Sequence, residues 1–282
     1  MLALSLPSPY LSGARDDPDA SLWQSLLGPP EAALAELAAL GVKAIELADV
    51  RGHVDPAAVT RSLLLVQDAG LEPHAHLWIP RGFDPVRPPV ALIAVVTAFE
   101  RRAQGLAAAR CAACAVHGHR RNDPGALVSS VRDLRALNAW LTTHGACAAL
   151  EVCRFRSEGP LGGTYAEVVE MARAAGPEVG ITWDLGHTTW NHQQGLDRLW
   201  PGPAFLERVA HVHVHDVGAN GRTHFPLDQA RAALEGFVER LKGVGYSGLW
   251  DLEVYPERWG GSTSEKRRRL EASLVRLARA TA

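Results

Sequence analysis

Hydrophobic and polar positions follow a repeating order along the chain. Amphipathic stretches with apolar residues three or four positions apart end in a Gly, and each is followed by a short apolar run. Examples are EAALAELAALG followed by VKAIELADV, and TRSLLLVQDAG followed by LEPHAHLW. A Gly just past a helix supplies the left-handed residue that ends it, so these glycines predict helix-to-strand turns. Helices and strands that alternate at this spacing indicate βαβ units and a parallel sheet.

The short apolar runs predict eight strands and a closing helix. The strands are expected near 2–6, 42–48, 71–77, 113–118, 147–152, 178–184, 209–215 and 248–254, and the helix over 264–280. Eight repeats without an orphan strand favour a closed barrel, and no G-x-G-x-x-G follows the first strand to support an open nucleotide-binding sheet. The chain has 282 residues, close to the roughly 250 that are typical of such a barrel. The sequence therefore predicts an α/β fold, a single-domain (β/α)8 TIM barrel over residues 1–282.

Period-two alternation then separates the side chains that face the barrel interior from those that face the helices. On the seventh strand His213 faces inward, and on the sixth Trp183 faces outward from Asp184. The other ionisable side chains predicted to face inward are Glu46, His74, His76, His117, His119, Glu151, His211, His215, Asp251 and Glu253. So many ionisable groups near one rim are costly to bury unless they bind something.

Four of these side chains lie where separate strands end. They are Glu151, Asp184, His213 and Glu253, and functional groups of a parallel barrel collect at the strand ends. Three carboxylates and one imidazole suit a hard or borderline cation such as Mn²⁺, Mg²⁺, Co²⁺ or Zn²⁺. Buried ion pairs are the alternative, but Arg154, the nearest cation, follows the fifth strand on a loop. The sequence predicts one divalent metal bound by these four residues.

Amino-acid composition indicates which classes of partner and which cellular compartment to expect. Lys+Arg 29 against Asp+Glu 31 gives a net charge of −2, so the molecule lacks the field that collects polyanions, which argues against nucleic acid as a partner. Four scattered cysteines suit a reducing cytoplasm. No run approaches the roughly 18 apolar residues of a membrane span, and the first ten residues read as a strand rather than a signal sequence. We expect a cytoplasmic protein without a membrane partner; the oligomeric state, a homo-oligomer included, stays open.

Four motifs carry a resemblance to a known family. They are LEVCRF, WDLGH with D-x-x-H spacing, HVHVHD and DLEVY. In this order, on successive strands, they resemble the xylose-isomerase-like TIM-barrel superfamily, also called AP endonuclease family 2, which holds sugar and sugar-phosphate isomerases and epimerases as well as the endonuclease IV group. The resemblance implies that Glu151, Asp184, His213 and Glu253 bind one divalent metal and that His187 contacts substrate.

Some residues match the endonuclease IV branch more closely. His74 in PHAHL, His117 in VHGH and His224 in HFPL match additional ligands of the three-zinc cluster found in that branch. The branch carries an aspartate two residues before the last of these histidines, and Arg222 stands there instead. A cation where the cluster needs an anion argues against a complete three-metal site.

Our first functional hypothesis is a metal-dependent isomerase or epimerase of a sugar or sugar derivative. Proton transfer next to a carbonyl forms an enediolate, whose charge a divalent ion stabilises as a Lewis acid. The resemblance implies that Glu151 and Glu253 are acid/base catalysts as well as metal ligands. The residues predicted to bind this small-molecule substrate are His187, Arg222, His74, His117 and Trp78.

Two other functional classes are also compatible with the sequence. The alternative is an endonuclease IV-like phosphodiesterase acting on abasic DNA, supported by His74, His117 and His224 and opposed by Arg222 and the charge balance. A barrel that binds a ligand without catalysis is the third, and an empty metal site would favour it. Fold alone does not separate these classes, because one scaffold hosts several chemistries.

Overall fold

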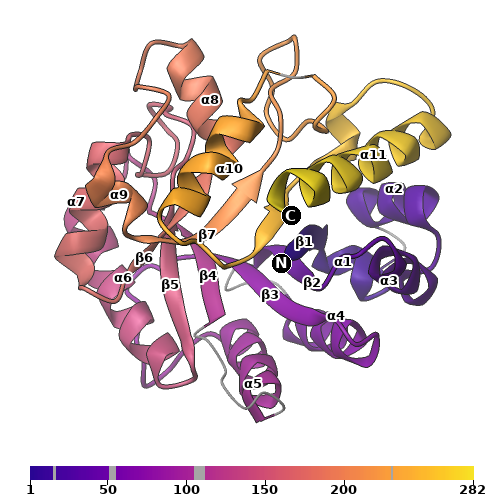
Figure 1. Ribbon diagram of the computed structural model, residues 1–282. Coiled ribbons are helices and arrows are strands. Elements are labelled where there is room, and N and C mark those ends of the chain that lie inside the picture. Colours follow the sequence, from indigo (N-terminus) through magenta and orange to yellow (C-terminus); the bar gives the residue numbers. More distant parts are fainter. Residues whose placement is uncertain (15–16, 51–54, 105–111, 230) are drawn as a thin grey trace.

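The computed structural model describes residues 1–14, 17–50, 55–104, 112–229 and 231–282. Its strands form a closed barrel in the order β1-β2-β3-β4-β5-β6-β7-β8, and every neighbouring pair is parallel (Figure 1). The strands are β1 (Leu2–Pro7), β2 (Ala44–Val50), β3 (Glu72–Trp78), β4 (Ala112–His117), β5 (Ala146–Glu151), β6 (Gly180–Asp184), β7 (Val209–Val214) and β8 (Trp250–Leu252). The predicted (β/α)8 barrel is confirmed.

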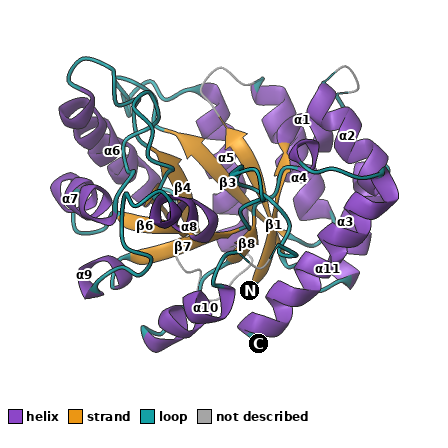
Figure 2. Cartoon of the chain, turned by 90° about the horizontal axis from the view of Figure 1, so that it is seen from above, coloured by secondary structure: helices purple, strands orange, loops and turns teal. Residues whose placement is uncertain are grey.

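Helices surround the strands on the outside, as the view from above shows (Figure 2). They are α1 (Ser8–Leu11), α2 (Pro18–Leu27), α3 (Pro30–Ala39), α4 (Pro56–Asp68), α5 (Val90–Gln104), α6 (Ala126–Thr142), α7 (Tyr165–Ala175), α8 (Leu185–Gln193), α9 (Pro203–Leu206), α10 (Leu234–Gly243), the 3-10 turn η1 (Pro256–Arg258) and α11 (Thr263–Thr281). The closing helix, expected over 264–280, is α11. In the described part of the chain, no helix is both long and apolar enough to cross a membrane.

Two of the predicted helix-to-strand turns have a glycine in the left-handed conformation. Gly41 follows α3 with φ +92, and Gly70 follows α4 with φ +74. Side chains with a Cβ rarely adopt this left-handed conformation, so a Gly at each position ends the helix and directs the chain into the next strand. The pattern of helix, Gly and strand in the sequence therefore follows from the geometry of the βαβ units.

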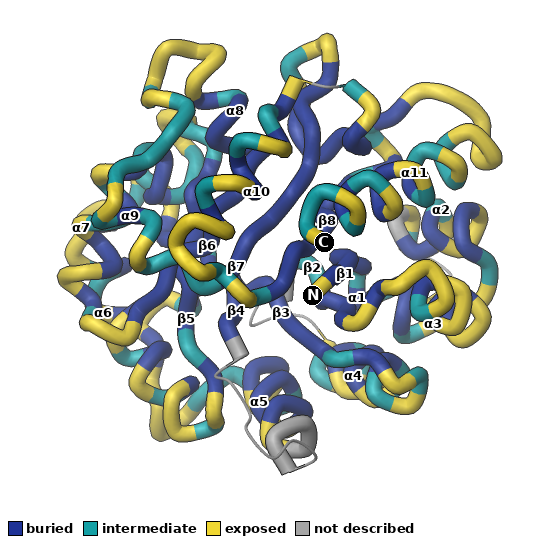
Figure 3. The backbone as a smooth tube through the Cα atoms, viewed as in Figure 1, coloured by how far each residue is buried: buried dark blue, intermediate teal, exposed yellow. Residues whose placement is uncertain are grey.

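The outward faces of the strands pack against the helices and form the main core. In Figure 3 the strands are almost entirely buried. Trp183 of β6 is fully buried, as predicted, and its ring centroid lies 4.2 Å from that of Phe237 on α10. Val212 and Val214 of β7 are buried on the same outward side. This packing fixes the strand bodies, so the inward side chains between them are held in position.

Strand register sets the level at which the polar side chains meet. Asp184 at the end of β6 lies opposite His213 of β7, and His213 lies opposite Asp251 of β8. The last strand is shorter than the predicted 248–254, so Glu253 comes one residue after it. The Glu253 N–H still donates to the Val214 carbonyl at 3.1 Å, and this bond holds Glu253 against β7.

Candidate metal centre

The four predicted ligands lie together at the carboxyl ends of the strands. Glu151 and Asp184 end β5 and β6, His213 lies on β7, and Glu253 follows β8. One side-chain donor atom from each lies within 4.8 Å of the others. None of the four residues is more than 1% exposed. Three carboxylates and an imidazole therefore share one small, water-excluded space.

Three histidines surround the Glu151 carboxylate. The Nε2 atoms of His76 and His117 each lie 2.8 Å from Glu151 Oε2, and His187 Nδ1 lies 3.0 Å from Oε1. Burial opposes the ionised carboxylate, but the interactions with the His117 and His76 rings outweigh it and hold the pKa of Glu151 well below its usual value. Glu151 is thus an anion in a site that bulk water does not reach.

Asp184 both faces the centre and begins α8. Its Oδ1 accepts the His187 backbone N–H at 2.7 Å, and His215 Nε2 lies 3.1 Å from the carboxylate. His187 was predicted to lie on a loop; it lies in the first turn of α8, because the Asp184 side chain caps that helix directly after the strand. Gly186 lies against the His215 ring, and a Cβ at that position would clash with it. The W-D-L-G-H motif therefore positions two imidazoles around one carboxylate.

A buried carboxylate on β2 orients His213. Glu46 Oε1 lies 2.9 Å from His213 Nε2, and Glu46 Oε2 lies 2.9 Å from His211 Nε2. Burial lowers the pKa of His213, but the Glu46 and Glu253 carboxylates outweigh burial and raise it to about 10. With Nε2 engaged by Glu46, Nδ1 is the nitrogen that faces the centre. This carboxylate–histidine pairing is the usual support of a metal-bound imidazole.

The Glu253 carboxylate contacts Tyr255 and two histidines. Tyr255 Oη donates to Glu253 Oε1 at 3.0 Å, and the Nδ1 atoms of His224 and His213 each lie 3.4 Å from Oε2. Burial opposes ionisation, but His224 and His213 hold the pKa of Glu253 well below its usual value. His224 has φ 64, and its ring stacks on Tyr255 with a centroid distance of 4.1 Å.

Several buried donor atoms of this centre make no well-aligned hydrogen bond among the described residues, although imidazole nitrogens lie 2.8 to 3.4 Å from the carboxylate oxygens. They are Glu151 Oε1, Glu151 Oε2, His213 Nδ1 and Glu253 Oε2. Buried polar atoms are rarely left without a partner, and clustered carboxylates repel one another unless a cation joins them. The residues present therefore fit a divalent ion held by Glu151, Asp184, His213 and Glu253.

The pairing with Glu46 leads to a prediction for metal affinity. Glu46→Gln keeps the size of the side chain but removes the charge that orients His213. We expect the affinity for the metal to fall by about 10- to 100-fold, measured by competition with a chelator. Glu170→Gln, on the exposed side of α7, is the matched control. An affinity equal to that of the wild type in the Glu46 variant would contradict this role.

A pocket of about 360 Å³ opens directly above the centre. Glu253 lines it, and Trp78 stacks on His117 in its wall with ring centroids 4.5 Å apart. The residues that line the pocket are His76, Trp78, His117, Cys153, Arg154, Arg156, Pro160, His187, His224, Glu253, Tyr255 and Arg258. His187, His117 and Trp78, all predicted to bind substrate, are thus brought together around one cavity.

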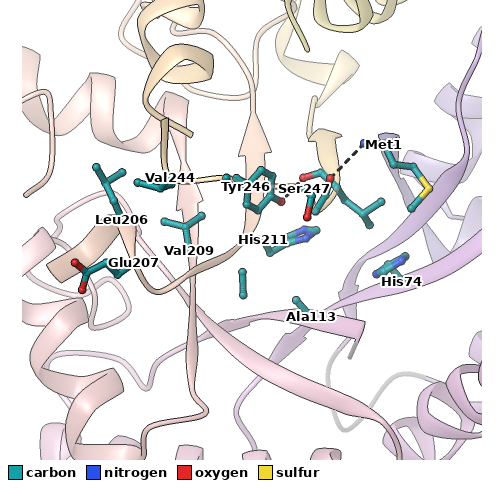
Figure 4. A pocket seen from close by; sticks show the side chains of 14 residues that line it. Met1, His74, Ala113, Leu206, Glu207, Val209, His211, Val244, Tyr246 and Ser247 are labelled. Carbon is teal, nitrogen blue, oxygen red and sulfur yellow. Dashed lines mark hydrogen bonds between the residues drawn. The ribbon is translucent and has the colours of Figure 1, made fainter. Parts of the chain in front are cut away.

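His74 lies elsewhere, at the opposite end of the barrel. It lines a separate pocket together with Met1, Ala113, His211 and Tyr246, near the amino-terminal ends of the strands (Figure 4). His76, two residues further along β3, lies beside Glu151 and lines the substrate pocket in which we expected His74. The expectation is corrected for a geometric reason: both side chains face inward, but only the one nearer the end of the strand reaches the rim.

Arg222 also lies away from the pocket. It is exposed on the loop between β7 and α10, where its carbonyl accepts the Gly218 N–H at 2.8 Å. The predicted contact of Arg222 with substrate is therefore not part of this geometry. The guanidinium groups that line the pocket belong to Arg154, Arg156 and Arg258 instead.

Sequence reasoning missed several residues of the site for want of a local signal. Arg154 and Arg156 lie on the loop after β5, and Arg258 and Tyr255 lie after β8. No period fixes where a loop side chain points. A signal did exist for His76, because it stands closer than His74 to the end of the strand.

Comparison with known proteins identifies the family. The model of the xylose isomerase-like TIM barrel matches residues 34–277. The chain belongs to this family. The match spans β2 to β8 and therefore includes all four candidate ligands. No curated protein sequence matches the chain.

Solved structures share the architecture of this xylose isomerase-like barrel. D-psicose 3-epimerase from Clostridium cellulolyticum H10 superposes with a TM-score of 0.60 at 15% identity, covering 100% of this chain and 99% of that one. D-allulose 3-epimerase from Methylomonas sp. gives 0.59 at 18% identity, covering 100% and 98%. A xylose isomerase domain protein from Alicyclobacillus acidocaldarius gives 0.56 at 18% identity, covering 99% and 100%. At these identities the likeness supports the fold alone.

Proposed function

We propose that the protein is a divalent-metal-dependent isomerase or epimerase of a sugar or sugar derivative. The observation that carries the proposal is the convergence of three buried carboxylates and His213 at the base of a pocket, with donor atoms that make no well-aligned hydrogen bond. A divalent ion, when bound, supplies Lewis-acid stabilisation of the charge that develops on a carbonyl oxygen. The epimerases among the similar structures agree with this class.

Glu253 is the proton-transfer group that faces the pocket directly. Its carboxylate lines the cavity, and Tyr255 Oη fixes Oε1 at 3.0 Å. A carboxylate with a low pKa is unprotonated at neutral pH, so it accepts a proton from a carbon next to a carbonyl. The hydrogen bond from Tyr255 orients the group without neutralising it.

Glu151 is the second proton-transfer group, and it lies one layer deeper. It is fully buried and is not among the residues that line the pocket. The Nε2 atoms of His76 and His117, each 2.8 Å from Oε2, connect this carboxylate with the cavity. Either ring can carry a proton between Glu151 and the substrate. Glu151 and Glu253 thus serve different sides of the substrate.

His187 and Trp78 hold the substrate in this proposal. His187 Nδ1 lies within 3.2 Å of both Glu151 and Asp184, so Nε2 is the nitrogen left for a substrate oxygen. The two carboxylates outweigh burial and raise the pKa of His187 to about 9, so the ring is a donor at neutral pH. Trp78, stacked on His117, offers an apolar face to the sugar carbons.

The proposed function is tested by incubating the metal-loaded protein with sugars in D₂O. Deuterium that appears at a carbon next to the carbonyl of a sugar would support the proposal.

The endonuclease IV-like alternative receives some support from additional donor sets. His76 lies with Glu151 and His213, and a separate set joins His187, His215 and His224. The second set contains no carboxylate, since Arg222 stands where that branch has an aspartate. His215 Nε2 is occupied by Asp184, and its Nδ1 accepts the His224 N–H at 3.0 Å. The set therefore lacks the ligands of a third ion.

We accordingly expect no three-metal cluster. At most one ion should bind besides that of the main centre, next to His76 and His117. Elemental analysis of protein loaded with excess Zn²⁺ and then desalted measures the stoichiometry. Three tightly bound ions per chain would contradict the prediction and promote phosphodiester cleavage to the first hypothesis.

A further inference from the structure

Three guanidinium groups share the pocket with the candidate metal centre. Arg154 and Arg156 come from the loop after β5, and Arg258 comes from η1 after β8. The one carboxylate among the described residues that line this pocket is Glu253, which belongs to the metal centre. The wall away from the metal therefore carries positive charge, although the whole chain carries a net charge of −2.

The Arg258 guanidinium is held beside the proposed reaction centre. Its Cζ lies 4.5 Å from the centroid of the Tyr255 ring, and Nη1 donates to the Thr223 carbonyl at 3.4 Å. The same Tyr255 donates through its hydroxyl to Glu253. Glu257 is near, with 3.6 Å between its Oε1 and Arg258 Nε, a distance too long for a strong hydrogen bond. Arg258 is thus oriented but keeps donors for a ligand.

The loop that carries Arg154 and Arg156 is anchored from below. The buried Asn191 of α8 accepts the Phe155 N–H at 2.9 Å and donates to the carbonyls of Cys153 and Gly163 at 3.0 Å each. The Cζ atom of Arg154 lies 5.5 Å from the centroid of the Trp190 ring. In the described part of the chain, neither arginine has a carboxylate partner. Their charges are therefore available to an anion.

The positive surface continues past the pocket. Arg156 and Trp78 also line an adjoining pocket that includes Arg120, from the loop after β4, and one carboxylate, that of Glu158. Guanidinium groups bind carboxylate and phosphate oxygens in paired hydrogen bonds. Like charges gathered around one cavity repel each other, and a bound anion relieves that repulsion.

We infer that the substrate carries a carboxylate or a phosphate, which Arg258 and Arg154 bind while Arg156 attracts it at the mouth. This inference rests on the proposed function and names its substrate class. The anionic group lies against the arginines, and the carbonyl lies toward the metal centre. The substrate is therefore a sugar acid or a sugar phosphate rather than a neutral sugar.

Incorporation of solvent deuterium into substrate tests the proposed preference for an anionic substrate. The metal-loaded protein is incubated in D₂O with D-fructose, fructose 6-phosphate or 5-keto-D-gluconate, and the rate of incorporation is measured for each. We expect kcat/KM for one of the two anionic compounds to exceed that for D-fructose by about 100-fold or more, and the preferred compound identifies the anion. Arg258→Gln and Arg154→Gln should each raise KM for it by about 10-fold or more, and raise KM for D-fructose by a smaller factor. Arg279→Gln, exposed on α11, is the matched control.

Binding of inorganic phosphate and of glycolate, measured by calorimetry, gives a readout independent of turnover. We expect weaker binding of at least one of them in the Arg258 and Arg154 variants at unchanged metal content. Equal exchange into D-fructose and the anionic compounds, with no effect of either variant, would overturn the inference and leave the isomerase proposal standing. Anion binding that depends on the arginines, without exchange into any sugar, would support the anion site and reject the isomerase proposal.

Discussion

Glu151→Gln and Glu253→Gln are each expected to lower turnover by about 100-fold or more while most of the metal is retained. The amide keeps an oxygen that can serve as a ligand, but it no longer accepts a proton at neutral pH, and general acid–base catalysis contributes a factor of this order. Each carboxylate is buried in a site where solvent does not replace its function. Initial rates of proton exchange, together with metal content, measure both quantities on one preparation.

The matched control for these variants is Glu170→Gln, which changes an exposed carboxylate on α7. It should keep the rate and the metal content of the wild type. If Glu253→Gln retains turnover, the group that faces the pocket is not the base. If Glu151→Gln alone retains turnover, the path through His76 and His117 is not used.

Asp184→Asn is expected to abolish tight metal binding, whereas the purified wild type holds one divalent ion. Asp184 is a fully buried carboxylate with His187 and His215 on either side. Burial opposes ionisation, but these two imidazoles outweigh it and lower the pKa of Asp184. Removal of the charge takes away one of three anionic ligands and leaves the two imidazoles without their partner.

Elemental analysis of both proteins measures the effect, and circular dichroism checks that the barrel is folded. Asp84→Asn, in an exposed loop, should retain the ion. Equal metal content in the wild type and the Asp184 variant, or no metal in either, would show that these residues form ion pairs with histidines rather than a metal centre.

The sequence predicts the barrel well because its repeat of helix, Gly and strand follows from the backbone geometry of each helix-to-strand turn. Each helix must end before the chain re-enters the sheet, and Gly41 and Gly70 mark that point with a backbone conformation that other residues disfavour. Alternation then assigned Trp183 to the outside and His213 to the inside, as the fold has them. The predicted boundaries differ by two residues at each end of β2 and of β8; at β8, Glu253 follows the strand but is held by a backbone bond to Val214.

The candidate site is only partly predictable from the same pattern. Alternation places His74 and His76 on one face and does not say how deep each lies, so it does not tell which of the two lines the pocket above the centre. Arg222 follows a strand that does end at the site, but its loop turns the side chain to the surface. Arg154 and Arg258 enter the pocket through contacts with Trp190 and Tyr255 that depend on tertiary packing. Loop geometry of this kind has no period in the sequence.

Incorporation of deuterium from D₂O into a sugar substrate tests the proposed isomerase or epimerase activity most directly. The metal-loaded protein is incubated with ketoses, aldoses, their phosphates and sugar acids, and an abasic-site DNA duplex is incubated in parallel. We predict deuterium at a carbon next to the carbonyl of one of these compounds, lost in Glu151→Gln and Glu253→Gln, with the duplex intact. Cleavage of the duplex without exchange into any sugar would contradict it.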